Sequence, residues 1–227
     1  MQEYSPVLFS SGEFQVELCI TPEQLDVALA ARARFYEAAD DVRVSPEGDQ
    51  FDRQANAKVF VVKREGKILG TIRNLIQSSE SSWLECQLSY YFPEGLVALG
   101  SSKTPFLEVS RLAEDTRLDR RTALCVQGML FRAQVISTTA ESVVYSTSLI
   151  RPRHSRFYKK YMQMSPQLYG IKIYDVETTL VVGHAPTECT FSYSLPETLG
   201  INMHTCIARY KVLKQRILTS SNLGFLP

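Results

Sequence analysis

The chain has 227 residues, of which 44% are hydrophobic and 22% are charged. These proportions are ordinary for a globular protein, and a chain of this length can bury a sizeable core. The formal net charge of +1 gives no overall field that would attract nucleic acid. Any charged partner must therefore be recognised through a local patch.

The sequence shows no targeting signal and no metal motif. The N-terminus has no basic region before a long apolar run, and no apolar stretch approaches the roughly 18 residues of a membrane-spanning helix. The five cysteines form no C-x-x-C pair, and the three histidines show no metal-ligand spacing. We expect a cytoplasmic protein with reduced thiols and no metal.

The first half of the chain combines clear secondary-structure signals with one long polar segment. Thr21 suits a helix N-cap, Pro22 suits the first helical position, and Glu65-Gly66 marks a tight turn between two apolar runs. These signals predict a strand over residues 13–20, a helix over 22–39, a polar loop over 40–57 and a β-hairpin over 57–77. Loops of this length inside a compact domain are usually functional or disordered.

The second half continues this alternation. Its apolar patterns predict strands over 108–115 and 142–148, a helix over 120–139, a short helix over 151–162, and a closing hairpin of strands over 169–175 and 178–184. The tail is expected to hold a strand over 189–195 and a basic helix over 205–218. This order indicates an α+β fold around one mixed sheet, with helices in the crossovers.

Several charges lie in segments that otherwise look like buried strands. Arg73 follows the apolar run ILGTI, and Glu108 and Arg111 lie within FLEVSRLAED. Buried charges are costly unless they are paired, and the available partners for the two arginines are Asp49 and Asp52 in the long loop and Glu108 itself, which could anchor Arg111. Such a network would fix the loop over the sheet, and it could also present carboxylates to a cationic substrate group.

These residues fall into four short motifs in a fixed order. The motifs are R-x-x-(apolar)-(aromatic) at Arg32, Phe35 and Tyr36, D-x-x-D at Asp49 and Asp52, G-x-x-R at Gly70 and Arg73, and E-x-S-R at Glu108, Ser110 and Arg111. Over about residues 22–185 the chain resembles the acyl-homoserine-lactone (autoinducer) synthases of bacterial quorum sensing. It also resembles their relatives, the N-acyl amino acid synthases.

This resemblance implies a fold similar to the GCN5-related N-acetyltransferases (GNAT): a three-layer α/β/α sandwich around a mixed, V-split sheet. It implies an acyltransferase domain over residues 1–185, which residues 186–227 would extend. In two respects the amine site departs from the family. Tyr36 stands where phenylalanine is usual, and the usual tryptophan a few residues later is absent.

The resemblance also implies roles for individual residues. The candidate catalytic residues are Glu108, Ser110 and Asp52, with Glu108, or an aspartate acting through water, as the base. The candidate substrate-binding residues are Arg32, Phe35, Tyr36, Asp49, Asp52, Arg73 and Arg111. No cofactor is expected to stay bound, and S-adenosylmethionine and an acyl-phosphopantetheine are the implied substrates.

The chemistry constrains the strand that carries E-x-S-R. Acylation of an amine needs a base for the amine proton and hydrogen-bond donors for the tetrahedral oxyanion. Strict strand alternation would place Glu108 and Ser110 on one face and Arg111 on the other. A bulge near Ser110 would let both charges reach one pocket and would free a backbone N–H group.

The turn before the second long helix indicates which kind of acyl donor the protein uses. The segment LDRRTALCVQG has no glycine in the loop, which serves poorly for close approach of a coenzyme A pyrophosphate. We therefore expect an acyl carrier protein, an acidic partner that seeks a basic surface. Docking and a merely solvated basic surface are both open for the candidate residues Arg120, Arg121, Arg153, Arg156, Lys159 and Lys160. Arg117, Arg151 and His154 belong to the same clusters.

The first functional hypothesis is acyl-homoserine-lactone synthesis from S-adenosylmethionine and an acyl carrier thioester, with release of methylthioadenosine. The alternatives are an N-acyl amino acid synthase, an acetyl-CoA N-acetyltransferase, and a non-catalytic binding module. The acyl tail needs an apolar tunnel. Its candidate lining residues, which also fit an ordinary core, are Leu124, Met129, Leu130, Val143, Tyr145 and Phe157.

Overall fold

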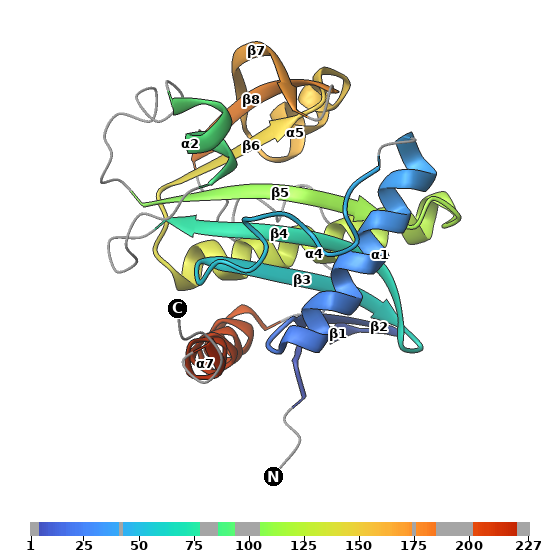
Figure 1. The fold of residues 1–227 in the computed structure, drawn as a ribbon. Coiled ribbons are helices and arrows are strands. Elements are labelled where there is room, and N and C mark those ends of the chain that lie inside the picture. The colour runs from blue at the N-terminus through green and yellow to red at the C-terminus, as the bar shows by residue number, and fades with distance from the viewer. Residues whose placement is uncertain are drawn as a thin grey trace.

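The computed structural model describes residues 5–40, 43–77, 86–93, 105–173, 176–184 and 202–221. Its centre is an eight-stranded mixed sheet with the order β1-β2-β3-β4-β5-β6-β8-β7 (Figure 1). The strands are β1 (Val7–Ser11), β2 (Phe14–Leu18), β3 (Ala57–Arg64), β4 (Lys67–Gln77), β5 (Phe106–Glu114), β6 (Tyr145–Ile150), β7 (Ser165–Ile173) and β8 (Val176–His184). The helices are α1 (Pro22–Asp40), α2 (Gln87–Tyr91), α4 (Arg120–Ala140), η1 (Pro152–His154), α5 (Ser155–Tyr161) and α7 (Met203–Ser221).

The first five strands pair antiparallel, and β5 then pairs parallel with β6. Helix α4 makes the crossover between these two strands, as parallel pairing requires. The predicted β3–β4 hairpin is confirmed, and both of its turn residues, Glu65 and Gly66, have positive φ angles of 50° and 75°. Two consecutive positive φ angles match the right-handed twist of the flanking strands.

Helix α1 covers one face of the sheet. Thr21 and Gln24 form a reciprocal cap at its start, because Thr21 Oγ1 accepts from Gln24 N at 3.3 Å and Gln24 Oε1 accepts from Thr21 N at 3.3 Å. Ala28 of α1 packs with Val59 and Val61 of β3. The predicted helix over 22–39 is therefore confirmed, including its start.

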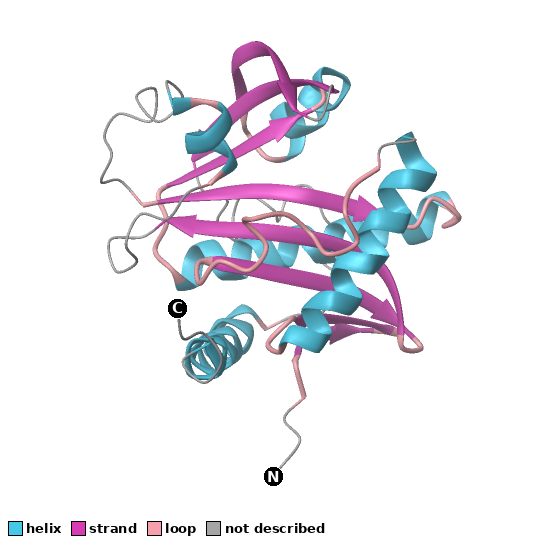
Figure 2. Cartoon of the chain, viewed as in Figure 1, coloured by secondary structure: helices cyan, strands magenta, loops and turns pink. Residues whose placement is uncertain are grey.

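Helices α4 and α7 cover the opposite face, where the largest apolar cluster lies (Figures 1 and 2). Tyr210 of α7 stacks on Phe60 of β3 with ring centroids 6.3 Å apart. Lys214 Nζ lies 2.6 Å from the carboxylate of Glu141, the residue that follows α4. The sheet thus forms the middle of three layers, as expected for a GNAT-like α/β/α sandwich.

The structure corrects several sequence predictions. Strand β1 and the short helix α2 were not predicted. Strand β6 begins at Tyr145 because Ser142, with a φ angle of 53°, makes a turn before it. The basic tail helix is confirmed as α7, whereas the strand predicted over 189–195 lies outside the described residues. None of the described helices is long and apolar enough to span a membrane.

Candidate active site

Strands β5 and β6 separate shortly after they begin. Their parallel pairing covers only Phe106–Glu108 against Tyr145–Thr147, although both strands continue beyond that point (Figure 1). At the fork, Ser148 Oγ donates a hydrogen bond of 2.7 Å to the carbonyl oxygen of Val109. Beyond this point residues 110–112 of β5 and 148–150 of β6 line one cavity.

A bulge in β5 lies directly at this fork. The β4–β5 register shifts between Thr71–Ala113 and Arg73–Ser110, so β5 has one residue more than β4 in this interval. Arg111, within the bulge, has a φ angle of 57°. The predicted bulge near Ser110 is confirmed, and it turns both Ser110 and Arg111 toward the same cavity.

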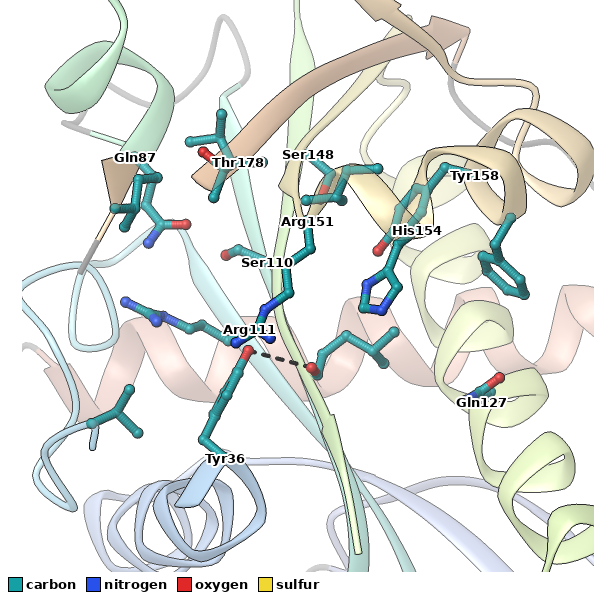
Figure 3. Close-up of a pocket in the computed structure, with 16 residues that line it drawn as sticks. Tyr36, Gln87, Ser110, Arg111, Gln127, Ser148, Arg151, His154, Tyr158 and Thr178 are labelled. Atoms are coloured by element: carbon teal, nitrogen blue, oxygen red, sulfur yellow. Dashed lines mark hydrogen bonds between the residues drawn. The ribbon is translucent and has the colours of Figure 1, made fainter. Parts of the chain in front are cut away.

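The cavity beside the fork has a volume of about 350 Å³ (Figure 3). Among the described residues that line the cavity, the basic side chains are those of arginine and histidine. No aspartate or glutamate is among these lining residues. Its polar lining residues come from α1, α2, β5, α4, β6, η1, α5 and β8, and are Tyr36, Gln87, Ser110, Arg111, Gln127, Ser148, Arg151, His154, Tyr158 and Thr178.

Asp52 anchors the long loop to α1 and β4. Its carboxylate accepts bonds from Arg32 Nη1 at 2.9 Å and Arg32 Nη2 at 2.5 Å, and it lies 3.0 Å from Arg73 Nη1. Burial alone would raise the pKa of Asp52, but the hydrogen bonds from Arg32 and the positive charges of Arg73 and Arg32 outweigh it. The pKa is therefore held well below its usual range, and Asp52 stays ionised.

Asp49 joins the loop to the bulge. Its Oδ1 lies 2.5 Å from Arg73 Nη1, and its Oδ2 accepts from Arg111 Nε at 3.1 Å and Nη2 at 2.5 Å. The same Arg73 guanidinium donates through Nε to Ser110 Oγ at 3.1 Å and lies over the ring of Phe51. The predicted pairing of Arg73 and Arg111 with the loop aspartates is thus confirmed.

Glu108 takes a different position from the one its sequence suggested. It does not pair with Arg111; its Oε2 accepts from the backbone N–H of Leu88 in α2 at 2.7 Å. Its side chain is buried behind the cavity wall, and its Oε1 has no hydrogen-bond partner. Burial raises the pKa of Glu108 despite the opposing charge of Arg73 and the bond from Leu88.

The aromatic residues of α1 divide between core and cavity. Tyr36 lines the cavity, and its hydroxyl donates to the carbonyl oxygen of Leu112 in the bulge at 3.3 Å (Figure 3). Phe35 is buried and does not line the cavity. Sequence reasoning predicted both beneath the amine site; the structure brings only Tyr36 to the cavity.

Sequence reasoning missed five polar lining residues, Gln87, Gln127, Ser148, Tyr158 and Thr178. Tyr158 is buried on α5, where desolvation raises its pKa to about 12, so its phenol stays protonated. The sequence carried one signal for it, since Tyr158 lies in an otherwise charged and exposed segment. Ser148 and Thr178 had no signal, because alternating hydroxyl residues are common in strands.

The acyl-tunnel set predicted from periodicity is largely wrong. Of its six members only Phe157 lines the cavity. Met129 and Leu130 lie on the buried face of α4 in the main core, whereas Leu124 is 56% exposed. The apolar wall of the cavity is instead formed by Val44, Leu112, Leu149, Ile150, Phe157 and Ile173.

The basic residues near the cavity fall into two groups, those that line it and those exposed at the surface. Arg151 and His154 line the cavity itself, whereas the sequence grouped them with a surface cluster (Figure 3). The other candidate docking residues are all exposed, at the start of α4 and on η1 and α5: Arg120, Arg121, Arg153, Arg156, Lys159 and Lys160. Their use as a docking surface stays a prediction.

A sheet forked beside a cavity, with helices on both faces, is the architecture of GNAT-like acyltransferases. Similar solved structures include a putative N-acetyltransferase from Lactobacillus plantarum, with 11% identity, a TM-score of 0.54, and coverage of 77% of this chain and 100% of that one. The family profile of the N-acyl amino acid synthase FeeM matches residues 28–175, more than half of the chain. The chain therefore belongs to this family of acyltransferases.

Two further solved structures share the fold at low identity. FeeM, an N-acyl amino acid synthase from uncultured soil microbes, has 17% identity and a TM-score of 0.63, and the match covers 78% of this chain and 96% of FeeM. The acyl-homoserine-lactone synthase LasI has 16% identity and a TM-score of 0.61, with coverage of 80% and 95%. No curated protein sequence matches the chain.

Proposed function

We propose that this enzyme transfers an acyl chain from the thioester of an acyl carrier protein to the amino group of an amino acid, forming an N-acyl amino acid. The observation that carries the proposal is the cavity at the β5–β6 fork in a member of the FeeM family. The fork gives an extended thioester arm access to the middle of the sheet. The bulge turns Ser110 and Arg111 toward the cavity, where the proposal puts the reacting carbonyl.

Ser110 is suited to stabilise the oxyanion. Its Oγ already accepts from Arg73 Nε, so its own hydroxyl hydrogen points elsewhere and can donate to a ligand in the cavity. The guanidinium also polarises the hydroxyl, which strengthens that bond. As negative charge develops on the thioester carbonyl, a preorganised donor of this kind favours the transition state.

Glu108 is the better of the two candidate bases. Burial raises the pKa of Glu108, which makes its carboxylate a stronger base, whereas Asp52 is bound by two guanidinium groups and its pKa is lowered. Because Glu108 is buried and does not line the cavity, it would receive the amine proton through a water molecule. We assign Asp52 to holding the loop.

The remaining step is departure of the thiol. The amine nitrogen bonds to the carbonyl carbon, the carbon–sulfur bond breaks, and the amine proton passes to Glu108. The departing sulfur takes the electron pair of the broken bond. The buried phenol of Tyr158, which lines the cavity in its neutral form, is placed to donate a hydrogen bond to this thiolate.

Two features support a carrier protein as the donor. The basic residues on η1 and α5 are exposed next to Arg151 and His154 of the cavity, so an acidic carrier could dock where its arm enters. The N-terminus of α4 is already occupied by the carboxylate of Asp119, which accepts from the backbone N–H groups of Arg121 and Thr122. A pyrophosphate would compete with this carboxylate.

Acyl-homoserine-lactone synthesis from S-adenosylmethionine is the second candidate. The specific observation in its favour is the likeness to LasI and to BjaI, a CoA-dependent acyl-homoserine-lactone synthase that has 14% identity and a TM-score of 0.58. The match to BjaI covers 84% of this chain and 93% of BjaI. Only this route would release methylthioadenosine.

The test is a reaction of the purified enzyme with acyl carrier thioesters of several chain lengths. The acceptors are a mixture of amino acids in one reaction and S-adenosylmethionine in another, and products are identified by mass spectrometry. An acyl amino acid supports the proposal, while an acyl lactone with methylthioadenosine supports the second candidate. Hydrolysis alone contradicts both. Glu108→Gln should lower kcat about 10²–10⁴-fold without changing the product.

A further inference from the structure

The wall of the cavity presents hydrogen-bond donors and keeps nearby carboxylates behind them. Asp49 lies behind Arg111, which binds it through Nε and Nη2. Glu114 lies behind Gln127, whose Nε2 donates to Glu114 Oε1 at 2.8 Å. Glu108 does not line the cavity either. Asp49 and Glu114 are thus each bound by a cationic or neutral side chain that lines the cavity, and none of the three acids lines it.

Two guanidinium groups reach this donor-rich wall. Arg111 enters it from the β5 bulge, and Arg151 enters it from the end of β6 (Figure 3). Guanidinium groups bind carboxylates with two parallel, charge-assisted bonds, which are about twice as strong as neutral ones.

The backbone at Arg111 supports a functional role for its orientation. An arginine with a φ angle of 57° is strained, and such strain persists where the surrounding structure requires it. Here the bulge directs the side chain to the cavity, and Asp49 holds it there through one edge of the guanidinium. The arginine is therefore preorganised before a ligand arrives.

We propose that Arg111 and Arg151 recognise the carboxylate of the acceptor amino acid, so that the cavity accepts anionic acceptors and disfavours acceptors with an additional positive charge. This inference rests on the proposed function and states which acceptors the enzyme selects. A neutral amide in place of the carboxylate would lose the charge-assisted bonds. A sulfonium or second ammonium group would face a wall whose described charged members are cationic.

The experiment measures direct binding of reaction products to the complete, carrier-free enzyme by calorimetry. The probes are N-decanoyl and N-palmitoyl phenylalanine, each compared with its carboxamide. The acid is expected to bind at least about tenfold more tightly than the amide. Arg151→Gln should reduce this ratio toward one, because it removes one guanidinium without touching Asp49.

Arg34→Gln is the matched control, since Arg34 is exposed on α1 and does not line the cavity; it should keep the full preference for the acid. Arg111→Gln is a second test, with its thermal unfolding measured in parallel because Arg111 also holds the loop. Equal binding of acid and amide by the unaltered enzyme would overturn this inference while leaving the proposed function in place. Failure of both products to bind would overturn the proposed function as well.

Discussion

Arg111 binds Asp49 across the mouth of the sheet, with Nε at 3.1 Å and Nη2 at 2.5 Å from Asp49 Oδ2. This contact joins a strained residue of β5 to the middle of the long loop between α1 and β3. Because Asp49 also binds Arg73, one carboxylate ties the loop to two strands at once. The loop and the bulge therefore hold each other in place.

Asp49→Asn is expected to lower the free energy of unfolding by about 2–3 kcal/mol, since removal of one partner leaves two largely buried guanidiniums without their shared counter-charge. Urea denaturation at neutral pH measures this change. The matched control is Asp26→Asn, whose partner Arg53 is also exposed; it should cost less than about 0.5 kcal/mol. Similar losses in both variants would show that the Asp49 network contributes little.

The sequence predicted the members of this network but not the positions of all of them. Charged residues in apolar strands need partners, and that argument alone paired Arg73 and Arg111 with the loop aspartates. It could not place Glu108, because the donor whose hydrogen bond it accepts is a backbone N–H of α2, a helix with no clear signal. A short helix next to β5 acts through its backbone, which side-chain patterns do not reveal.

More of the fold than of the cavity could be predicted from the sequence. The hairpin and the long helices were predictable because local capping, turn and periodicity signals agree with the final structure. The apolar cavity wall was not, because Met129 and Phe157 both read as apolar residues of a helix. Only the tertiary arrangement decides that Met129 is core and Phe157 lines the cavity.

Glu108 should make stability depend on pH in a direction opposite to that of an ordinary paired carboxylate. Burial raises its pKa, so the folded protein binds this proton more tightly than the unfolded chain. Its contribution is full below the unfolded carboxyl pKa and is lost as pH rises through the raised pKa. Glu108→Gln, which cannot ionise, should therefore gain stability relative to the unaltered protein between pH 5 and pH 8.

The measurement is denaturation of both proteins at pH 5 and at pH 8. Glu13→Gln serves as the control, because Glu13 is exposed and pairs with Arg64 at the surface; it makes the same substitution without changing the buried site. If the difference between Glu108→Gln and the unaltered protein is the same at both pH values, the folded protein binds this proton no more tightly than the unfolded chain, and the pKa of Glu108 is not raised.

Docking of an acidic carrier should make turnover sensitive to salt. The exposed residues Lys159 and Lys160 lie on α5 next to the cavity, and screening weakens such surface attractions. Raising the salt from about 0.05 to 0.5 M should lower kcat/KM for an acyl carrier protein by about tenfold, mainly through slower association. An acyl-pantetheine thioester without the carrier should show little change.

Charge reversal at these lysines gives an independent check. Lys159→Glu combined with Lys160→Glu should lower kcat/KM for the carrier substrate and leave the acyl-pantetheine reaction unaffected. Lys67→Glu, in the exposed β3–β4 turn, is the control for a general change of net charge. Equal effects at both places would argue against docking on α5.

Asp119 should set the choice between carrier-bound and coenzyme A donors. Its Oδ1 accepts from the N–H groups of Arg121 and Thr122 at 3.0 and 3.1 Å, and its Oδ2 accepts from Thr122 Oγ1 at 2.6 Å. The carboxylate thus fills the N-terminus of α4, where a helix binds phosphate groups best. Asp119→Gly should raise kcat/KM for acyl-CoA severalfold relative to the acyl carrier, because glycine still suits the N-cap.

Asp119→Asn distinguishes the effect of the negative charge from the effect of a side chain that fills the N-terminus of α4. An asparagine keeps the cap but removes the charge. An intermediate donor preference in this variant is expected if repulsion of the pyrophosphate contributes. Both variants are compared in competition assays that contain acyl-CoA and acyl carrier together, with the products labelled by different acyl chains. An unchanged preference in both variants would mean that the donor is selected elsewhere, with the basic residues on α5 as the next place to test.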